Sequence, residues 1–116
     1  MANPDVVDLA QLDRYTGGDR VINREILLIF DAQCREMLGQ LESLASHTAD
    51  GKAWRDIVHT LKGAARGIGA FSLGESAAEA EKAETGQGTA ISALLRLRED
   101  AAAVHAFIAE FLDKSH

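Results

Sequence analysis

Apolar residues recur at intervals of three and four along almost the whole chain, and this spacing constrains the fold more than any other feature. Residues three and four apart share one face of an α-helix, so each such run predicts a helix with one buried stripe. Proline, which would interrupt a helix interior, occurs once, at position 4. Aromatic residues make up only 5% of the chain, and no strand is visible in the pattern. The sequence therefore predicts an all-α protein.

The first part of the pattern predicts a short helix followed by a long one. The short helix is expected over residues 5–14, closed by the glycines at positions 17 and 18. Asp19 can cap the long helix that follows, because a carboxylate at this position accepts unpaired backbone N–H groups. The apolar positions of the long helix advance by threes and fours through Ile22, Ile26, Phe30, Cys34, Met37, Leu41 and Leu44.

Three more helices are expected in the rest of the chain. One carries Trp54 through Ile68, with Thr48 or Asp50 as its cap and Gly69 at its end. The next is expected over residues 73–84, because Ser72 and Glu75 have the spacing of a capping box. Its inward residues are expected to be Leu73, Ala77 and Ala80. The last opens at Thr89, with inward positions at Leu94, Leu97, Ala101, Val104, Ile108 and Phe111.

The links between these helices are short, so consecutive helices are expected to lie antiparallel. The predicted architecture is an up-down-up-down antiparallel four-helix bundle, with the short N-terminal helix covering one end. A length of 116 residues and a hydrophobic content of 47% suit one core, so we expect a single domain over residues 1–116.

Charge and composition exclude several classes of protein. A net charge of −6 argues against a general nucleic-acid binder, which needs positive charge along a face. No leader and no apolar run of about 18 residues is visible, so we expect a cytoplasmic protein with no membrane partner. Cys34 is the one cysteine, so no disulfide can form within the chain. The initiating Met1 favours a free-standing protein over a piece of a larger kinase.

His59 is the residue that most needs a functional explanation. At about 100° per residue, with Ile57 at zero, the apolar residues of its helix fall within roughly 60° on either side, whereas His59 falls near 200°. The imidazole is therefore expected to face solvent. The other histidines, His47, His105 and His116, lack comparable neighbours in the sequence, and no histidine pair has the spacing of a metal site.

The neighbours of His59 suit an anionic group. Lys62 is three residues further on and Gly63 four, so the ammonium lies beside the imidazole and the glycine leaves one flank uncovered. Arg55 and Arg66 fall on the same face and complete a small basic patch on an acidic molecule. An ordinary solvated surface histidine is the simpler alternative.

This segment resembles the histidine-containing phosphotransfer (HPt) domain family. The family pattern, His-x-Leu-Lys-Gly followed by small residues and then Gly-Ala, is matched by His59, Leu61, Lys62, Gly63, Ala64, Ala65, Gly69 and Ala70. On the next helix, Leu73 and Glu81 lie where the family tends to place a leucine and a glutamate. The resemblance implies a phosphoacceptor at His59, a cationic neighbour at Lys62 and a gap for the partner at Gly63. Arg66 is a second candidate cation for the phosphate.

The resemblance also implies the partners. Response-regulator receiver domains are expected to supply and accept the phosphoryl group, with a hybrid histidine kinase as a further candidate. The chain has no glycine-rich nucleotide loop and no carboxylate cluster for magnesium, so we expect no cofactor of its own, Mg²⁺ on the receiver, and a phosphocarrier without kinase activity. We also expect a monomer.

Two alternatives stay open. One is an HPt-like helical interaction module that docks a signalling partner without being phosphorylated. The other is the dimerisation and phosphoacceptor part of a histidine kinase, which would need a stable dimer and an ATP-binding domain that the sequence does not show.

Overall fold

The computed structural model describes residues 5–47 and 50–114, and their secondary structure is entirely helical. The all-α prediction is therefore confirmed. The helices of this described part are α1 (Leu9–Thr16), α2 (Arg20–Leu44), α3 (Gly51–Gly67), α4 (Phe71–Ala80) and α5 (Gly88–Lys114).

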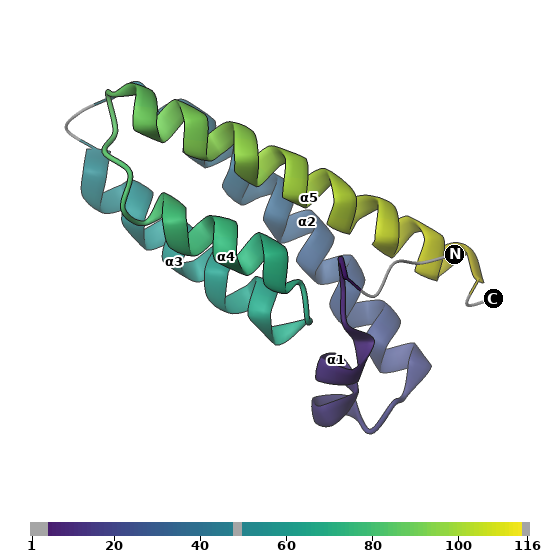
Figure 1. Ribbon diagram of the computed structural model, residues 1–116. Coiled ribbons are helices and arrows are strands. Elements are labelled where there is room, and N and C mark those ends of the chain that lie inside the picture. Colours follow the sequence, from purple (N-terminus) through teal and green to yellow (C-terminus); the bar gives the residue numbers. More distant parts are fainter. Residues whose placement is uncertain (1–4, 48–49, 115–116) are drawn as a thin grey trace.

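Helices α2 to α5 form a closed ring around the core (Figure 1). Along this ring α2 packs against α3, α3 against α4, α4 against α5, and α5 against α2, so α3 and α5 occupy opposite corners. The long helices α2 and α5 extend past α3 and α4, and α1 packs against α2 at the extended end. The largest fully buried side chains are Leu27, Leu41, Trp54, Leu61, Leu73 and Leu97. Among the described residues, no helix combines the length and apolar character that crossing a membrane requires.

Helix α1 begins at Leu9, later than predicted, and the backbone of Asp8 just before it hydrogen-bonds to the link between α3 and α4. Asp8 caps α1 by accepting the N–H of Ala10 at 3.1 Å, and its own N–H donates to the carbonyl of Gly69 at 2.9 Å. Gly69 has a φ of +86°, and a Cβ at this position would overlap the Asp8 carbonyl oxygen. Only glycine therefore allows this close approach.

Asp19 caps α2 as predicted, accepting two backbone N–H groups at 2.9 and 3.1 Å. The predicted stripe is wrong at its first position, since Ile22 is 44% exposed and Asn23 is buried in its place. The Asn23 amide donates to Asp13 Oδ1 at 2.8 Å and accepts from Thr16 Oγ1 at 2.6 Å. These bonds satisfy the buried amide and tie α1 to α2.

The predicted caps of the next two helices differ from the structure. Asp50 occupies the N-cap of α3, but its side chain makes no capping bond and lies 3.5 Å from His47 Nδ1; Thr48 lies outside the described residues. The capping box at Ser72 and Glu75 is wrong, because α4 already begins at Phe71. The left-handed turn at Gly69 brings the N–H of Ala70 within 2.8 Å of the Ala65 carbonyl, which sets the start of α4 without a side-chain cap.

The remaining predictions for α4 and α5 agree more closely. Helix α4 ends at Ala80 instead of residue 84, and α5 begins at Gly88, one residue before Thr89. The residues expected to point inward from both helices are buried. These are Leu73, Ala77 and Ala80 in α4, and Leu94, Leu97, Ala101, Val104, Ile108 and Phe111 in α5.

Candidate functional site

His59 lies on the outward side of α3, as the periodicity predicted, and its side chain is 71% exposed. The buried stripe of α3 is displaced from the predicted centre, however, because Val58 is fully buried and Ile57 only partly so. This displacement turns Lys62 toward the flank of the helix, where its side chain is only 20% exposed. The lysine therefore packs beside α4 and is not a freely solvated surface residue.

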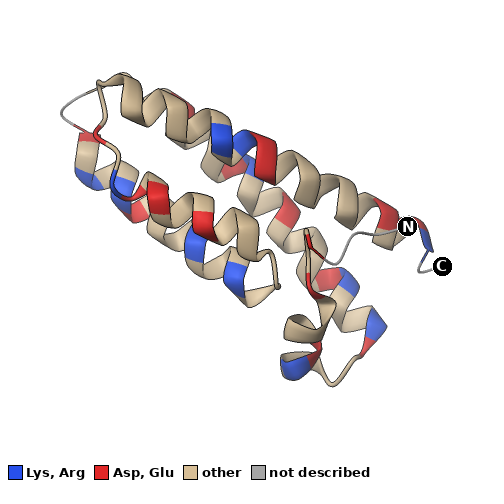
Figure 2. Cartoon of the chain, viewed as in Figure 1, with Lys and Arg blue, Asp and Glu red and all other residues tan. Residues whose placement is uncertain are grey.

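Glu81, the residue that directly follows α4, lies between the two basic side chains of α3. Its Oε1 atom pairs with Lys62 Nζ, and its Oε2 atom lies 3.6 Å from His59 Nδ1. Figure 2 shows basic segments of α3 beside acidic segments of α4. Hydrogen bonding from Lys62 lowers the pKa of the Glu81 carboxyl below its ordinary value, against a smaller opposing effect of desolvation. Glu81 is therefore a carboxylate at neutral pH.

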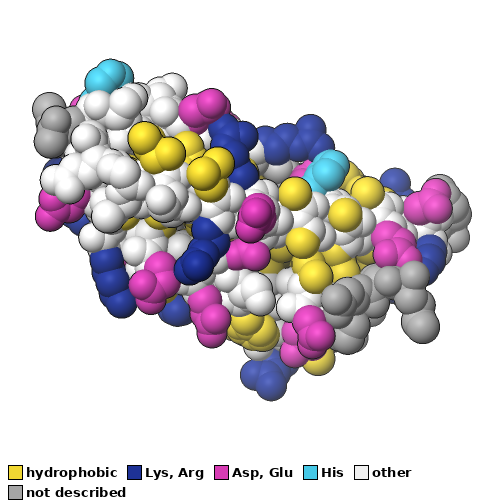
Figure 3. Space-filling model, turned by 45° about the horizontal axis from the view of Figure 1, so that its top comes forward, with side chains coloured by type: hydrophobic (Ala, Val, Ile, Leu, Met, Phe, Trp, Pro, Cys, Tyr) yellow, Lys and Arg dark blue, Asp and Glu magenta, His cyan; other side chains and the backbone are white. Residues whose placement is uncertain are grey.

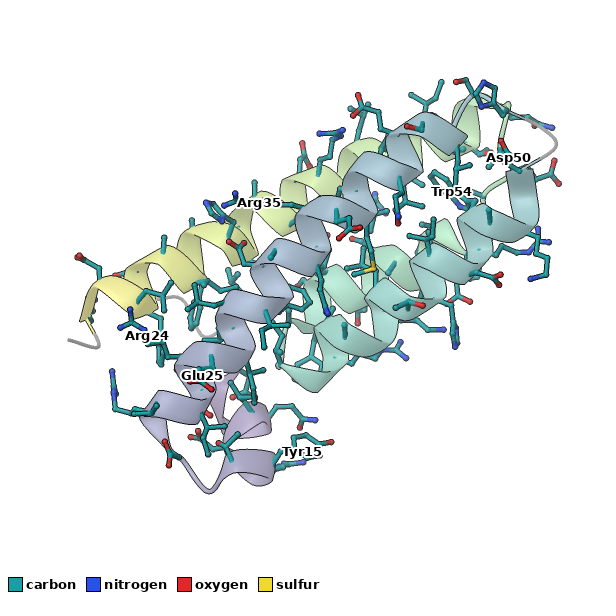
Figure 4. The ribbon with its side chains drawn as sticks, turned by 180° about the vertical axis from the view of Figure 1, so that it is seen from behind. Tyr15, Arg24, Glu25, Arg35, Asp50 and Trp54 are labelled. Carbon is teal, nitrogen blue, oxygen red and sulfur yellow. The ribbon has the colours of Figure 1, made fainter. Side chains whose placement is uncertain are left out.

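Trp54 holds the end of α4 where Glu81 begins. Its indole Nε1 is fully buried and donates to the carbonyl oxygen of Ala80 at 2.9 Å. That carbonyl is in the last turn of α4, where backbone acceptors have no partner within the helix. Figure 4 shows the indole inside the bundle, near the start of α3. Periodicity predicted Trp54 only as a core residue and contained no signal for this bond.

The His59 ring has one nitrogen beside a carboxylate and one directed away from it. Because Nδ1 faces Glu81, the ring nitrogen directed away from the carboxylate is Nε2. One and two turns further along α3, a Cβ added at Gly63 or Gly67 would meet nothing within 4 Å. The arrangement combines an exposed nitrogen nucleophile, an adjacent cation and an open flank.

The other predicted cations of the basic patch are directed away from His59. A Cβ at Gly74 would come within 3.0 Å of Arg66 Cγ, so the stem of Arg66 lies across α4. A Cβ at Gly51 would come within 3.3 Å of Arg55 Nη1, so the Arg55 guanidinium lies beside Gly51, one helical turn earlier in α3. The structure therefore brings Lys62 and Gly63 close to His59, and leaves Arg55 and Arg66 further away.

An apolar groove lies beyond the two open glycines of α3. It has a volume of about 370 Å³ and is formed by α1, α2 and α3. Tyr15 and Ile29 on its rim are 73% and 57% exposed, and Figure 4 shows Tyr15 projecting from α1. Ala64 and Gly67 of α3, with Ile68 directly after it, line the α3 side of the groove. Sequence periodicity did not reveal this groove, because it depends on the position of α1.

His105 has more neighbours than its sequence context indicated. Its Nδ1 lies 2.8 Å from Asp31 Oδ1, and Arg35 is within 3.2 Å of the ring, so the three side chains join α2 to α5. The His105 side chain is 50% exposed. His47 lies beside Asp50, and His116 lies outside the described residues. Like His59, His105 is thus an exposed histidine with an acid and a base beside it, but no glycine opens its flank.

Comparison with protein families supports one assignment. The family model described as Hpt domain matches residues 25–110, which include α3, α4, His59, Lys62 and Glu81. No significant match was found among curated proteins or among solved structures. The match covers well over half of the chain and includes the residues around His59, but not α1.

Proposed function

Since this chain belongs to the Hpt domain family, we propose that His59 accepts a phosphoryl group from the aspartyl phosphate of one receiver domain and passes it to the aspartate of another. Hpt domains carry out histidine phosphotransfer in two-component phosphorelays, and they interact with the receiver domains of response regulators. The geometry around His59 supports the choice of this residue as the phosphoacceptor.

The observation that carries the proposal is an imidazole 71% exposed, with Nδ1 facing a carboxylate. A proton on Nδ1 leaves the lone pair on Nε2 for attack on phosphorus. The N–P bond forms as the bond from phosphorus to the aspartyl oxygen breaks, and the carboxylate leaves with the electron pair. The proton stays on Nδ1 beside Glu81. Transfer to a second aspartate reverses these changes.

Lys62 is proposed to offset the charge of the phosphoryl oxygens. Its Nζ already lies at the site, held by Glu81, and its flexible stem allows it to turn toward a group on Nε2. Gly63 leaves room for the partner beside the ring. The stem of Arg66 lies against Gly74 of α4, and we assign this exposed side chain only a contribution to the positive potential of the face.

The apolar groove formed by α1, α2 and α3 is the proposed docking surface for the receiver. A partner that reaches His59 across the open glycines of α3 would also cover Ile29 and Tyr15. The partner would supply the acceptor aspartate and Mg²⁺, while this chain, an up-down-up-down bundle in our proposal, presents the histidine rigidly. The receiver of a hybrid histidine kinase is one candidate donor.

Transfer of labelled phosphate from a phosphorylated receiver tests the proposal. We expect the chain to take up an acid-labile label, His59→Gln to take up none, and His105→Gln to match the wild type. The histidine control is stringent because His105 also has an acid and a base beside it. Uptake by His59→Gln would show that the site is wrong. Binding of the receiver without any uptake would favour the unphosphorylated interaction module.

A further inference from the structure

A polar cluster centred on the buried side chain of Asn23 joins α1 to the first turn of α2. The Asn23 amide donates to Asp13 Oδ1 at 2.8 Å and accepts from Thr16 Oγ1 at 2.6 Å. All three residues precede the segment 25–110 that the family model matches, so membership of the family does not account for them. Apolar groups of the same shape can be nearly neutral for stability in place of such a cluster. Its distinctive contribution is to fix one arrangement of the two helices.

The link between α1 and α2 does not by itself set the direction of α1. It consists of residues 17–19, and its two glycines have φ values of +67° and +79°. Glycine adopts many backbone conformations at little cost, so this link can follow different directions of α1. The other end of α1 is held by the backbone bond from Asp8 to Gly69. The Asn23 cluster therefore fixes the end of α1 that carries Tyr15.

This end of α1 contributes to the apolar groove. Leu12 and Tyr15 line the groove from α1, together with residues of α2 and α3. The described residues that line it are all uncharged, whereas acidic, basic and hydrophobic side chains are interspersed on the face along α5 (Figure 3). Tyr15 is exposed, and large aromatic side chains often dominate the binding energy of an interface. The shape of the groove thus depends on where α1 lies.

We propose that Asn23 is a positioning residue for receiver docking, which holds α1 so that Leu12 and Tyr15 complete the surface that the receiver contacts. This inference rests on the proposed function, because the receiver is the partner. Gly67, which lines the groove, follows His59 by two turns on the same face of α3, about 12 Å along the helix axis. A standard interface of about 800 Å² on each partner spans both places. Asn23 acts through α1 and not through the ring of His59.

Reversing the hydrogen bond between Asn23 and Asp13 tests whether the cluster holds α1. Asn23→Asp removes the amide donor and places two carboxylates side by side. Adding Asp13→Asn restores the bond in the opposite direction and keeps the net charge, because the introduced amide donates to the introduced carboxylate, which still accepts from Thr16. Amide hydrogen exchange over residues 9–16 should be faster in Asn23→Asp and return to the wild-type rate in the double variant. Unchanged exchange in Asn23→Asp would overturn the proposal.

Single-turnover transfer at a series of receiver concentrations tests the effect on docking, with a receiver domain that phosphorylates the wild type. Asn23→Asp and Tyr15→Ala should each raise the half-saturating receiver concentration about 10-fold or more and leave the rate at saturation unchanged. The double variant should match the wild type. An unchanged half-saturating concentration in Asn23→Asp or in Tyr15→Ala would overturn the proposal, as would a loss confined to the rate at saturation.

A destabilised control separates docking from stability. Leu97→Ala removes core contacts of α5, which packs against α2 and α4, and leaves α1 in place. Under conditions where every variant is fully folded, Leu97→Ala should have the half-saturating concentration of the wild type. An increase as large as that of Asn23→Asp would show that any loss of stability weakens docking, and would overturn the specific role of Asn23.

Failure of the proposed phosphotransfer has a different result. If the wild type binds the receiver without taking up phosphate, calorimetric titration of the same variants with that receiver replaces the transfer assay. Weaker binding by Asn23→Asp that is restored in the double variant supports the role of Asn23 even then. Equal affinities of all variants overturn this role and leave transfer to His59 untouched. A wild type that binds none of the receiver domains tested overturns both proposals.

Discussion

Glu81 Oε2 lies 3.6 Å from His59 Nδ1, so a carboxylate on the link after α4 faces the ring of the proposed phosphoacceptor on α3. The same carboxylate pairs through its other oxygen with Lys62. In the proposed transfer, it favours the proton on Nδ1, leaves Nε2 to the receiver, and keeps a cation within reach of the phosphoryl group. Glu81 acts through its neighbours and is a positioning residue.

Because Glu81 is paired with Lys62, the free energy of unfolding should depend on pH in the acidic range. The pKa of Glu81 is lowered in the folded state, mainly by Lys62, so its stabilising contribution is present above the ordinary glutamate pKa of about 4.3. It is lost as the pH falls through the lower, folded-state pKa. Urea unfolding at a series of pH values should show a smaller loss of unfolding free energy for Glu81→Gln than for the wild type. Glu75→Gln, at an exposed position of α4, should follow the wild type; identical profiles for all three proteins would contradict the assignment.

Lys62→Ala should slow phosphoryl uptake without abolishing it. A hydrogen bond to a charged group is worth about 1.5–3 kcal/mol, which corresponds to roughly 10- to 100-fold in rate. Single-turnover transfer from a phosphorylated receiver measures this difference. Lys52→Ala serves as the control, because Lys52 is an exposed lysine of α3 that pairs with Asp56 instead. Equal rates for both variants would show that Lys62 serves only to hold Glu81.

Gly63 should be tolerant of substitution in the isolated protein and intolerant in the transfer complex. A Cβ meets nothing within 4 Å at either Gly63 or Gly39, so alanine at each position should raise the free energy of unfolding by about 0.5–1 kcal/mol. A larger side chain at position 63 would occupy the open flank of His59. We expect Gly63→Leu to remain folded and lose transfer, and Gly39→Leu to keep it. Normal transfer by Gly63→Leu would show that the partner does not need the open flank at Gly63.

Trp54→Phe should lower the free energy of unfolding and slow phosphoryl transfer. The change keeps an aromatic ring in the core but removes the indole donor, so the Ala80 carbonyl keeps only the N–H of Ala83 at 3.1 Å; the loss of one hydrogen bond costs about 0.5–1.5 kcal/mol. Chemical unfolding measures that loss, and phosphotransfer under conditions where the variant is fully folded measures the effect on the site. We expect slower transfer, because Glu81 follows Ala80 directly. A lower free energy of unfolding with an unchanged transfer rate would show that the indole hydrogen bond does not set the position of Glu81.

The sequence predicted the helices and the exposure of His59 because helical periodicity reports directly which residues face the core. Leu94, Leu97 and Ile108 in α5 are buried for this reason. The capping box at Ser72 is wrong because a local pattern was overridden by the backbone turn at Gly69, whose geometry depends on contact with Asp8.

The helical periodicity could not predict which side chains make contacts between helices. The ion pair between Lys62 and Glu81 depends on how α3 and α4 pack, and a shift of the buried stripe from Ile57 to Val58 is enough to bring Lys62 against α4. The helical periodicity did not predict the burial of Asn23 either. Burying this polar side chain is favourable only because α1 supplies its hydrogen-bond partners.

The most direct test of the central claim is to identify the phosphorylated atom by NMR. Protein labelled with ¹⁵N at histidine and phosphorylated by a receiver should show one nitrogen coupled to ³¹P, assigned to Nε2 of His59, and this signal should be lost in His59→Gln. A coupled nitrogen on His105 or His47 would contradict the account, as would coupling at Nδ1 of His59, where Glu81 is expected to keep the proton.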